Sequence, residues 1–121
     1  LITNHEMHSE HFNVSKEAGE EINGAKKRIS IGTTVTRVLE HMALDSEGKI
    51  IHGSGETNIF IYPGYQFKCV DALLTNFHLP KSTLFMLVCA LAGTNLMKEA
   101  YKKAVEEEFR FFSYGDCCLI L

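Results

Sequence analysis

The polar run TNFHLPKST, residues 75–83, is the strongest candidate for chemistry in this sequence because it separates two apolar stretches. Lys81, Ser82 and Thr83 would open a helix at the end of this loop. The first turn of a helix offers unpaired N–H groups and the positive end of the helix dipole, which together attract anions. The simpler alternative is that Ser82 only caps a core helix.

A second candidate lies at residues 32–34, where a short β-branched run ends and a helical pattern begins. Ligands of open α/β sheets bind at such junctions, so Thr33 and Thr34 could receive a phosphate, a carboxylate or a ribose hydroxyl. Arg37, one turn further on, could pair with a carboxylate. The motif lacks the glycines of a dinucleotide fold and the lysine of a P-loop, and a plain helix cap is the alternative.

In the N-terminal run HEMHSEH, the side chains of His5, His8, Glu10 and His11 could all bind a metal. Their spacing is not HExxH, and on a strand His5 and His11 would lie far apart on the opposite face from His8 and Glu10. A metal site is therefore disfavoured. We interpret His8 and Glu10 as a pair that orients a substrate or passes a proton, with ordinary surface residues as the alternative.

Asp116 follows Tyr114 and Gly115 at the entrance to the last apolar run. Residues of this type are common in turns, and an aspartate at a strand entrance can also serve as a second carboxylate in a site. The sequence leaves both interpretations open.

Hydrophobic periodicity and turn residues predict the elements that would position these side chains. The expected helices are one starting at Ser15, Val35–Leu44 with Val35, Val38, Leu39 and Met42 on its apolar face, one opening at Ser82 and ending before Gly93, and Asn95–Phe109 with Leu96, Ala100, Ala104 and Val105 inward. The expected extended segments are Arg28–Ile31, Ile50–Ile51, Asn58–Tyr62, Phe67–Leu74 and Cys117–Leu121. This alternation favours an α/β fold with a partly parallel or barrel-like sheet flanked by helices.

With 121 residues, the chain is long enough for one domain with a hydrophobic core. Its net charge of -3 provides no broad basic field for nucleic acid, so any RNA contact would need local clusters. Four cysteines in apolar runs without CxxC spacing indicate reduced, buried thiols and a cytoplasmic protein. No apolar run is long enough to need a membrane. The first residue is not Met and the last ones are apolar, so we expect a fragment of a larger protein.

Four motifs, in this order, resemble the S-adenosylmethionine:tRNA ribosyltransferase-isomerase family of queuosine biosynthesis: HEMHSE, IGTTVTR, IFIYPGYQFKCVDALLTNFHLPKST and FRFFSYGD. The resemblance covers essentially the whole chain. It implies that residues 1–121 form the C-terminal portion of the main α/β domain of a two-domain protein. The N-terminal segment and an inserted β-rich domain would then lie outside this chain, and we expect the chain alone to be inactive.

The resemblance implies an enzyme without a prosthetic group that uses S-adenosylmethionine as a ribose donor. The ribosyl unit would be transferred to aminomethyl-deazaguanine at the wobble position of tRNA and isomerised, which gives epoxyqueuosine and releases adenine and methionine. The expected partners are that tRNA and S-adenosylmethionine, with no membrane, and we expect a monomer at full length. The alternative from another class is a non-catalytic RNA- or phosphate-binding α/β module.

Such a reaction needs a base, donors that stabilise the leaving adenine and a pocket for the methionine carboxylate. As hypotheses, His78 or His8 acts as base or proton relay, and Asp116 is the third candidate catalytic residue. Asn76 and Asp116 would contact ribose hydroxyls or the base amine. The candidate substrate-binding residues are Thr33, Thr34, Arg37, Asn76, Lys81, Ser82, Thr83, Glu10 and Tyr114.

Overall fold

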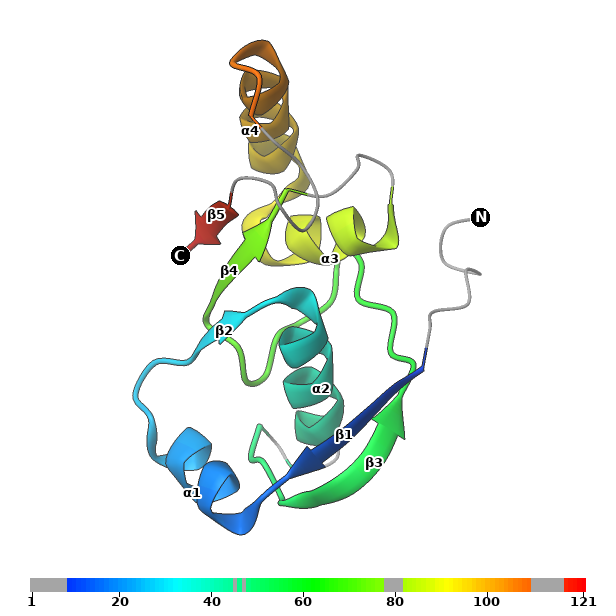
Figure 1. Cartoon of the computed structure of the whole chain (residues 1–121), viewed down its shortest axis with the longest axis vertical. Helices are drawn as coiled ribbons and strands as arrows, with labels where there is room; N and C mark the ends of the chain where they lie inside the picture. The colour runs from blue at the N-terminus through cyan, green and yellow to red at the C-terminus, as the bar shows by residue number, and fades with distance from the viewer. Residues whose placement is uncertain (1–8, 45, 47, 78–81, 110–116) are drawn as a thin grey trace.

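The computed structural model describes residues 9–44, 46, 48–77, 82–109 and 117–121. Its elements, in chain order, are β1 (Glu10–Val14), α1 (Lys16–Gly24), β2 (Ile29–Ile31), α2 (Thr33–Ala43), β3 (Gly53–Thr57), β4 (Ala72–Asn76), α3 (Thr83–Ala92), α4 (Thr94–Glu106) and β5 (Cys117–Ile120). The long axis runs from α1 at one end of the molecule to α4 at the other (Figure 1).

Two small sheets are present within the described ranges. One has the strand order β2-β4-β5, in which β2 and β4 are parallel and β5 is antiparallel to β4. The other is the antiparallel pair β1-β3. The prediction of an α/β fold with a partly parallel sheet is therefore confirmed.

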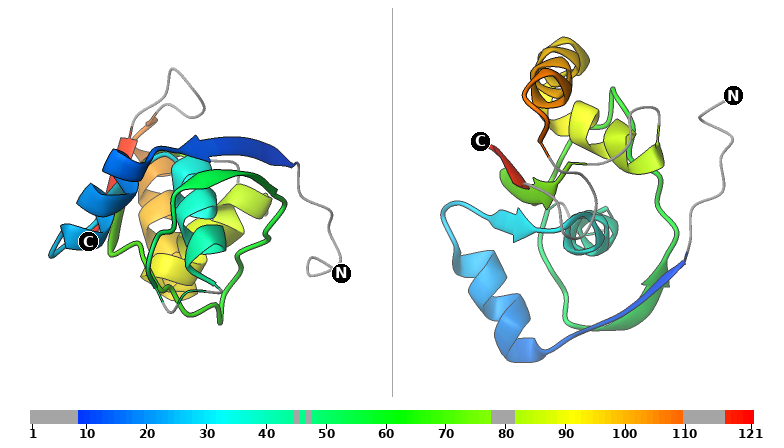
Figure 2. Two further views of the ribbon diagram at one scale, coloured as in Figure 1. Left: turned by 90° about the horizontal axis from the view of Figure 1, so that it is seen from below. Right: turned by 45° about the horizontal axis from the view of Figure 1, so that its top comes forward.

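Helix α2 lies between the two sheets and contacts strands of both (Figure 2). It buries its polar side: Thr36 and Glu40 are 0% exposed and Arg37 is 3% exposed. Val35, expected on the inward apolar face, is 44% exposed, whereas Leu39 on the same face is buried. The predicted orientation of this helix is thus only partly right, because hydrogen bonds described below satisfy the buried polar groups.

The caps expected at Ser15 and Ser82 are confirmed, whereas α2 begins without a side-chain cap from Thr33 or Thr34. The Ser15 hydroxyl accepts a hydrogen bond from the Ala18 N–H at the start of α1, and the Ser82 hydroxyl accepts one from the Phe85 N–H at the start of α3. Gly93 ends α3 with a φ of 99°, a conformation that suits glycine.

Helices α3 and α4 pack on β4 and β5 around an aromatic cluster. The Tyr101 ring lies 4.7 Å from Phe85 and 5.1 Å from Phe77, measured between ring centroids. This contact turns Met97, Tyr101 and Ala104 of α4 inward. The predicted inward face was therefore wrong in part, since Leu96 is 60% exposed and Val105 is 61% exposed.

Three segments predicted as extended runs form less strand than expected. Residues 50–51 and 58–62 are not strands, and of residues 67–74 only the end belongs to β4. Instead, the polar segment GSGET forms β3, which pairs with β1. The ring of Phe12 on β1 lies over Gly55, where a Cβ would come within 2.8 Å of Phe12 Cζ.

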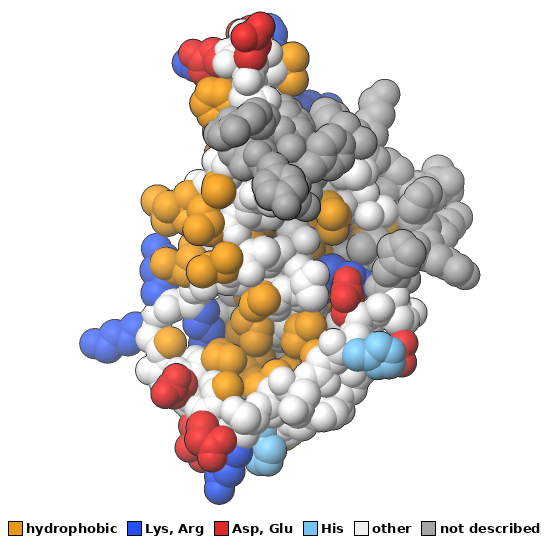
Figure 3. Space-filling model, viewed as in Figure 1, with side chains coloured by type: hydrophobic (Ala, Val, Ile, Leu, Met, Phe, Trp, Pro, Cys, Tyr) orange, Lys and Arg blue, Asp and Glu red, His pale blue; other side chains and the backbone are white. Residues whose placement is uncertain are grey.

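An apolar depression lies between α1, α2, β1 and β2, and hydrophobic side chains gather on this face (Figure 3). It consists of two adjoining grooves of about 480 and 510 Å³ that share Ile22, Val35 and Leu39. In the described part of the chain, no helix is long and apolar enough to span a bilayer.

The cysteines are free thiols with different environments. Cys69 and Cys89 are buried, and burial raises the pKa of both. Burial also raises the pKa of the half-buried Cys118, whereas Cys117 is exposed. The prediction of reduced, buried thiols is confirmed for the first two and is wrong for Cys117, which begins β5.

Candidate functional site

The two strand-to-helix junctions predicted as anion sites lie at the same edge of the three-stranded sheet. Since β2 and β4 are parallel, both of their carboxyl ends point to this edge. The Gly32 N–H, just after β2, donates a hydrogen bond of 2.8 Å to the Leu74 carbonyl of β4. Thr33 and Thr34 at the start of α2 therefore lie next to the end of β4, which carries Asn76.

The start of α2 leaves its first N–H groups without a side-chain cap. Gly32 occupies the N-cap position with a φ of 93°, and Thr33 and Thr34 follow as the first helical residues. Helix α4 also begins after an uncapped glycine, Gly93, so the missing cap alone does not mark a site. What sets α2 apart is that it begins at the carboxyl end of a parallel strand, the usual ligand position in such sheets.

The start of α3 differs, because the hydroxyl of Ser82 is already engaged with the Phe85 N–H at 3.0 Å. The capping alternative considered for Ser82 therefore describes this hydroxyl. Thr83, the first residue of α3, is half-buried. Of the two predicted anion positions, the start of α3 thus has a side-chain cap and the start of α2 has none.

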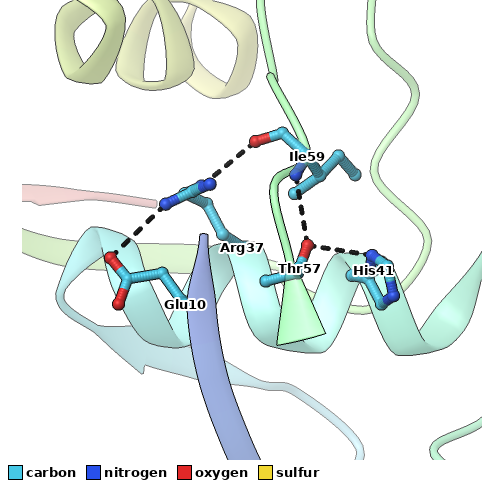
Figure 4. A network of polar contacts seen from close by, with 5 residues as sticks. All are labelled: Glu10, Arg37, His41, Thr57 and Ile59. Carbon is cyan, nitrogen blue, oxygen red and sulfur yellow. Dashed lines mark hydrogen bonds and ion pairs between the residues drawn. The ribbon is translucent and has the colours of Figure 1, made fainter. Parts of the chain in front are cut away.

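Arg37 and Glu10, both predicted to bind substrate, meet each other (Figure 4). The Arg37 Nη1 lies 3.5 Å from the Glu10 Oε1, and its Nε donates to the Ile59 carbonyl at 3.1 Å. Burial lowers the pKa of Arg37 and the charge of Glu10 opposes that shift. The carboxylate that Arg37 pairs with here belongs to the chain itself, while the Glu10 side chain is 35% exposed and reaches solvent.

The same network continues to two residues that the sequence did not single out (Figure 4). The buried Thr57 accepts a hydrogen bond from the Ile59 N–H at 3.2 Å, and its hydroxyl lies 2.8 Å from Nδ1 of His41. His41 is one turn after Arg37 on α2. Both backbone polar groups of Ile59 are therefore satisfied from side chains instead of from a neighbouring strand.

Glu40 is a second polar side chain of α2, after His41, that the sequence did not single out. Its carboxylate is 0% exposed and accepts four hydrogen bonds of 2.8–2.9 Å, from the Tyr65 hydroxyl and the N–H groups of Lys68, Cys69 and Val70. A glutamate beside apolar helix residues is normally solvent-exposed, so its spacing gave no signal. Arg37, Glu40 and His41 together fix the connection from β3 to β4.

Several predicted site residues lie outside the described part of the chain. These are His5, His8, His78, Lys81, Tyr114 and Asp116. Of the described residues near them, Cys117 at the start of β5 is the register partner of Asn76 at the end of β4. Among the described residues, no group of three or more metal-binding side chains occurs. The His11 Nε2 lies 4.0 Å from the Glu56 Oε1 on the surface.

The sequence model of a family described as "Queuosine biosynthesis protein" matches residues 1–120. The chain belongs to this family. It is 53% identical over 120 residues to the S-adenosylmethionine:tRNA ribosyltransferase-isomerase of Syntrophus aciditrophicus, which covers 99% of this chain and 33% of that protein. It is 56% identical to the protein of the same name from Symbiobacterium thermophilum, with 98% of this chain and 36% of that protein covered.

A solved queuosine family structure, the S-adenosylmethionine tRNA ribosyltransferase of Thermotoga maritima, matches with a TM-score of 0.82 at 43% identity. The match covers 92% of this chain and 40% of that one. The chain therefore spans about a third of the length of the curated queuosine family members it matches. The resemblance noted from the motifs is confirmed at the level of the family.

Proposed function

We propose that this chain contributes part of the active site of an S-adenosylmethionine-dependent tRNA ribosyltransferase-isomerase. The observation that carries the proposal is the hydrogen bond from Gly32 of the GTT motif to Leu74, which brings the start of α2 next to the end of β4, where the motif TNFHLPKST begins. Identities of 53–56% to proteins of that name support it. The proposed reaction moves the ribosyl unit of S-adenosylmethionine to aminomethyl-deazaguanine of tRNA in the cytoplasm.

In this proposal the N–H groups of Thr33 and Thr34 hold an anionic group, either the methionine carboxylate or a tRNA phosphate. Asn76 at the neighbouring strand end contacts a ribose hydroxyl. Glu10 presents its exposed oxygen to a hydroxyl or an amine of the substrate. The roles of His78, His8, Asp116, Lys81, Ser82, Thr83 and Tyr114 remain the hypotheses stated from the sequence.

The direct test measures adenine release from S-adenosylmethionine. A longer protein in which this chain supplies its C-terminal third is incubated with S-adenosylmethionine and tRNA carrying aminomethyl-deazaguanine, and adenine is quantified by chromatography. We expect release only when that tRNA is present. Binding of the tRNA without any adenine release would favour the non-catalytic RNA-binding module instead.

A matched pair of variants tests the anion pocket at the start of α2. Thr33→Asp adds a negative charge beside the proposed anion, whereas Thr94→Asp adds the same charge at the equivalent position of α4, which also follows an uncapped glycine. An acidic residue stabilises either helix start, so both variants should fold. Repulsion between the new carboxylate and the bound anion a few ångströms away should be about 1.4 kcal/mol or more. In Thr33→Asp only, this would raise the KM for the substrate that carries the anion, S-adenosylmethionine or tRNA, by about tenfold. Equal KM values for the two variants would refute the pocket.

A further inference from the structure

The Glu10 carboxylate is held by a series of contacts that involve two side chains of α2, Arg37 and His41. Arg37 holds Glu10 at 3.5 Å, and the guanidinium is itself fixed by the Ile59 carbonyl. A guanidinium that is 3% exposed has little freedom to leave its acceptors, since an unpaired buried charge is costly. The orientation of the Glu10 side chain therefore depends on Ile59 as well as on the pairing of β1 with β3, in which Glu10 lies opposite Thr57.

The position of Ile59 is set by Thr57 and His41. Ile59 is in a segment without strand partners, and its N–H donates to the Thr57 hydroxyl. That hydroxyl is 2.8 Å from His41 Nδ1, and Thr57 is 1% exposed. His41 and Arg37 are four residues apart on α2. Helix α2 therefore contacts this segment twice: His41 is next to the Thr57 hydroxyl, and Arg37 donates to the Ile59 carbonyl (Figure 4).

We propose that Thr57 and His41 are positioning residues for Glu10 and act on it through Ile59 and Arg37. Neither side chain has to touch the substrate. Their effect is to keep the guanidinium, and with it the carboxylate, in one orientation, as outer residues do for the ligands they support. The inference rests on the proposed function, in which Glu10 contacts the substrate.

The test compares variants that differ by the Thr57 hydroxyl. Thr57→Val removes the hydroxyl at nearly constant shape, and Thr57→Ser keeps it. The control is Ser54→Ala on the same strand, which removes an exposed hydrogen bond to Asn13 at 3.0 Å. In the longer protein we expect kcat/KM for adenine release to fall about tenfold in Thr57→Val and to stay within about twofold in Thr57→Ser and Ser54→Ala.

A double-mutant cycle separates positioning from a general loss of structure. In the background of Glu10→Gln, Thr57→Val should slow the reaction by less than about twofold, because the group it positions has already been changed. Its effect on the melting temperature should be the same in both backgrounds. His41→Asn, which retains a polar group near Nδ1, should be more active than His41→Ala.

Each outcome of the cycle either supports or overturns the positioning role. Equal slowing by Thr57→Val in the parent and in Glu10→Gln, or a Thr57→Ser variant as slow as Thr57→Val, overturns the inference and leaves the proposed function standing. A parent protein that releases no adenine refutes the proposed function, and this inference with it. Should Thr57→Val not fold, His41→Asn and His41→Ala are compared in the same two backgrounds, and equal activity of these two variants overturns the inference.

Discussion

Replacing Glu40 by glutamine should release the connection between β3 and β4. The carboxylate accepts from the Tyr65 hydroxyl and the Lys68 N–H at one oxygen, and from the N–H groups of Cys69 and Val70 at the other. Glutamine has the same shape but puts an NH₂ donor in place of one oxygen. It should turn that NH₂ toward Tyr65, whose hydroxyl can rotate and accept, and so leave the Lys68 N–H without its acceptor.

The expected cost follows from these four contacts. The lost acceptor costs about 1–3 kcal/mol, and the two hydrogen bonds that remain at the other oxygen lose the strengthening effect of charge, about 1 kcal/mol each. Relief from burying a charge offsets part of this loss. We therefore expect about 3 kcal/mol less stability for the segment that contains residues 65–70 in Glu40→Gln.

Hydrogen exchange followed by mass spectrometry on the longer protein reports this segment directly. A loss of about 3 kcal/mol corresponds to exchange about 100-fold faster for peptides that contain Cys69 and Val70. The control Glu99→Gln removes an equivalent charge from the exposed face of α4 and should leave that exchange unchanged. Exchange in Glu40→Gln within about threefold of the Glu99→Gln value would refute the reasoning.

Three further predictions concern single groups. Burial and the neighbouring Glu40 raise the pKa of Tyr65. An unfolded tyrosine loses its proton near pH 10, so the free energy of unfolding should fall as the pH rises above about 10. In urea unfolding, Tyr65→Phe should show a smaller decline over this pH range. Iodoacetamide at pH 8 should modify the exposed Cys117 well before Cys69, whose thiol pKa burial raises, and equal labelling by mass spectrometry would contradict this. Ser82→Ala should lower the free energy of unfolding by about 1 kcal/mol through loss of the α3 cap, whereas Ser82→Asp should not.

Much of the helical structure could be predicted because its signals are local. Ser15 and Ser82 cap their helices, and Gly93 ends α3, as the sequence indicates. A partly parallel sheet was also expected from the alternation of elements, and β2 and β4 form its parallel pair. These features depend on residues within a few positions of one another or on the order of elements.

The wrong strand predictions share one physical cause: the backbone groups of these segments bond to side chains and not to a neighbouring strand. The Asn23 amide pairs with both the N–H and the carbonyl of Ile50, Thr57 and Arg37 do so for Ile59, and Glu40 takes the N–H groups of residues 68–70. A β-branched, apolar run looks the same in sequence whether its backbone bonds to a strand or to distant side chains. The partners lie at least 22 residues away, except for the local bond from Ile59 to Thr57.

The candidate site could be located from sequence only through motifs. The junctions at Thr33 and Asn76 were found because their residue types are typical of binding loops. The pairing of Arg37 with Glu10 was not foreseen, since both were assigned to the substrate and nothing in the spacing joins β1 to α2. A buried polar side chain on an amphipathic helix, such as Glu40, can be recognised only once the tertiary packing of the helix is known.

Strand β2 is an outer strand of the three-stranded sheet, and this has a consequence for the chain in solution. Within the described residues β2 pairs only with β4, so its outer backbone groups are unpaired, and its side chains Ile29 and Ile31 are 53% and 70% exposed. An edge strand that is both unpaired and apolar is a template for strands of other molecules. The 121-residue chain made on its own should therefore self-associate with increasing concentration, and aggregation should begin at residues 29–31 before the aromatic core around Tyr101 is disturbed.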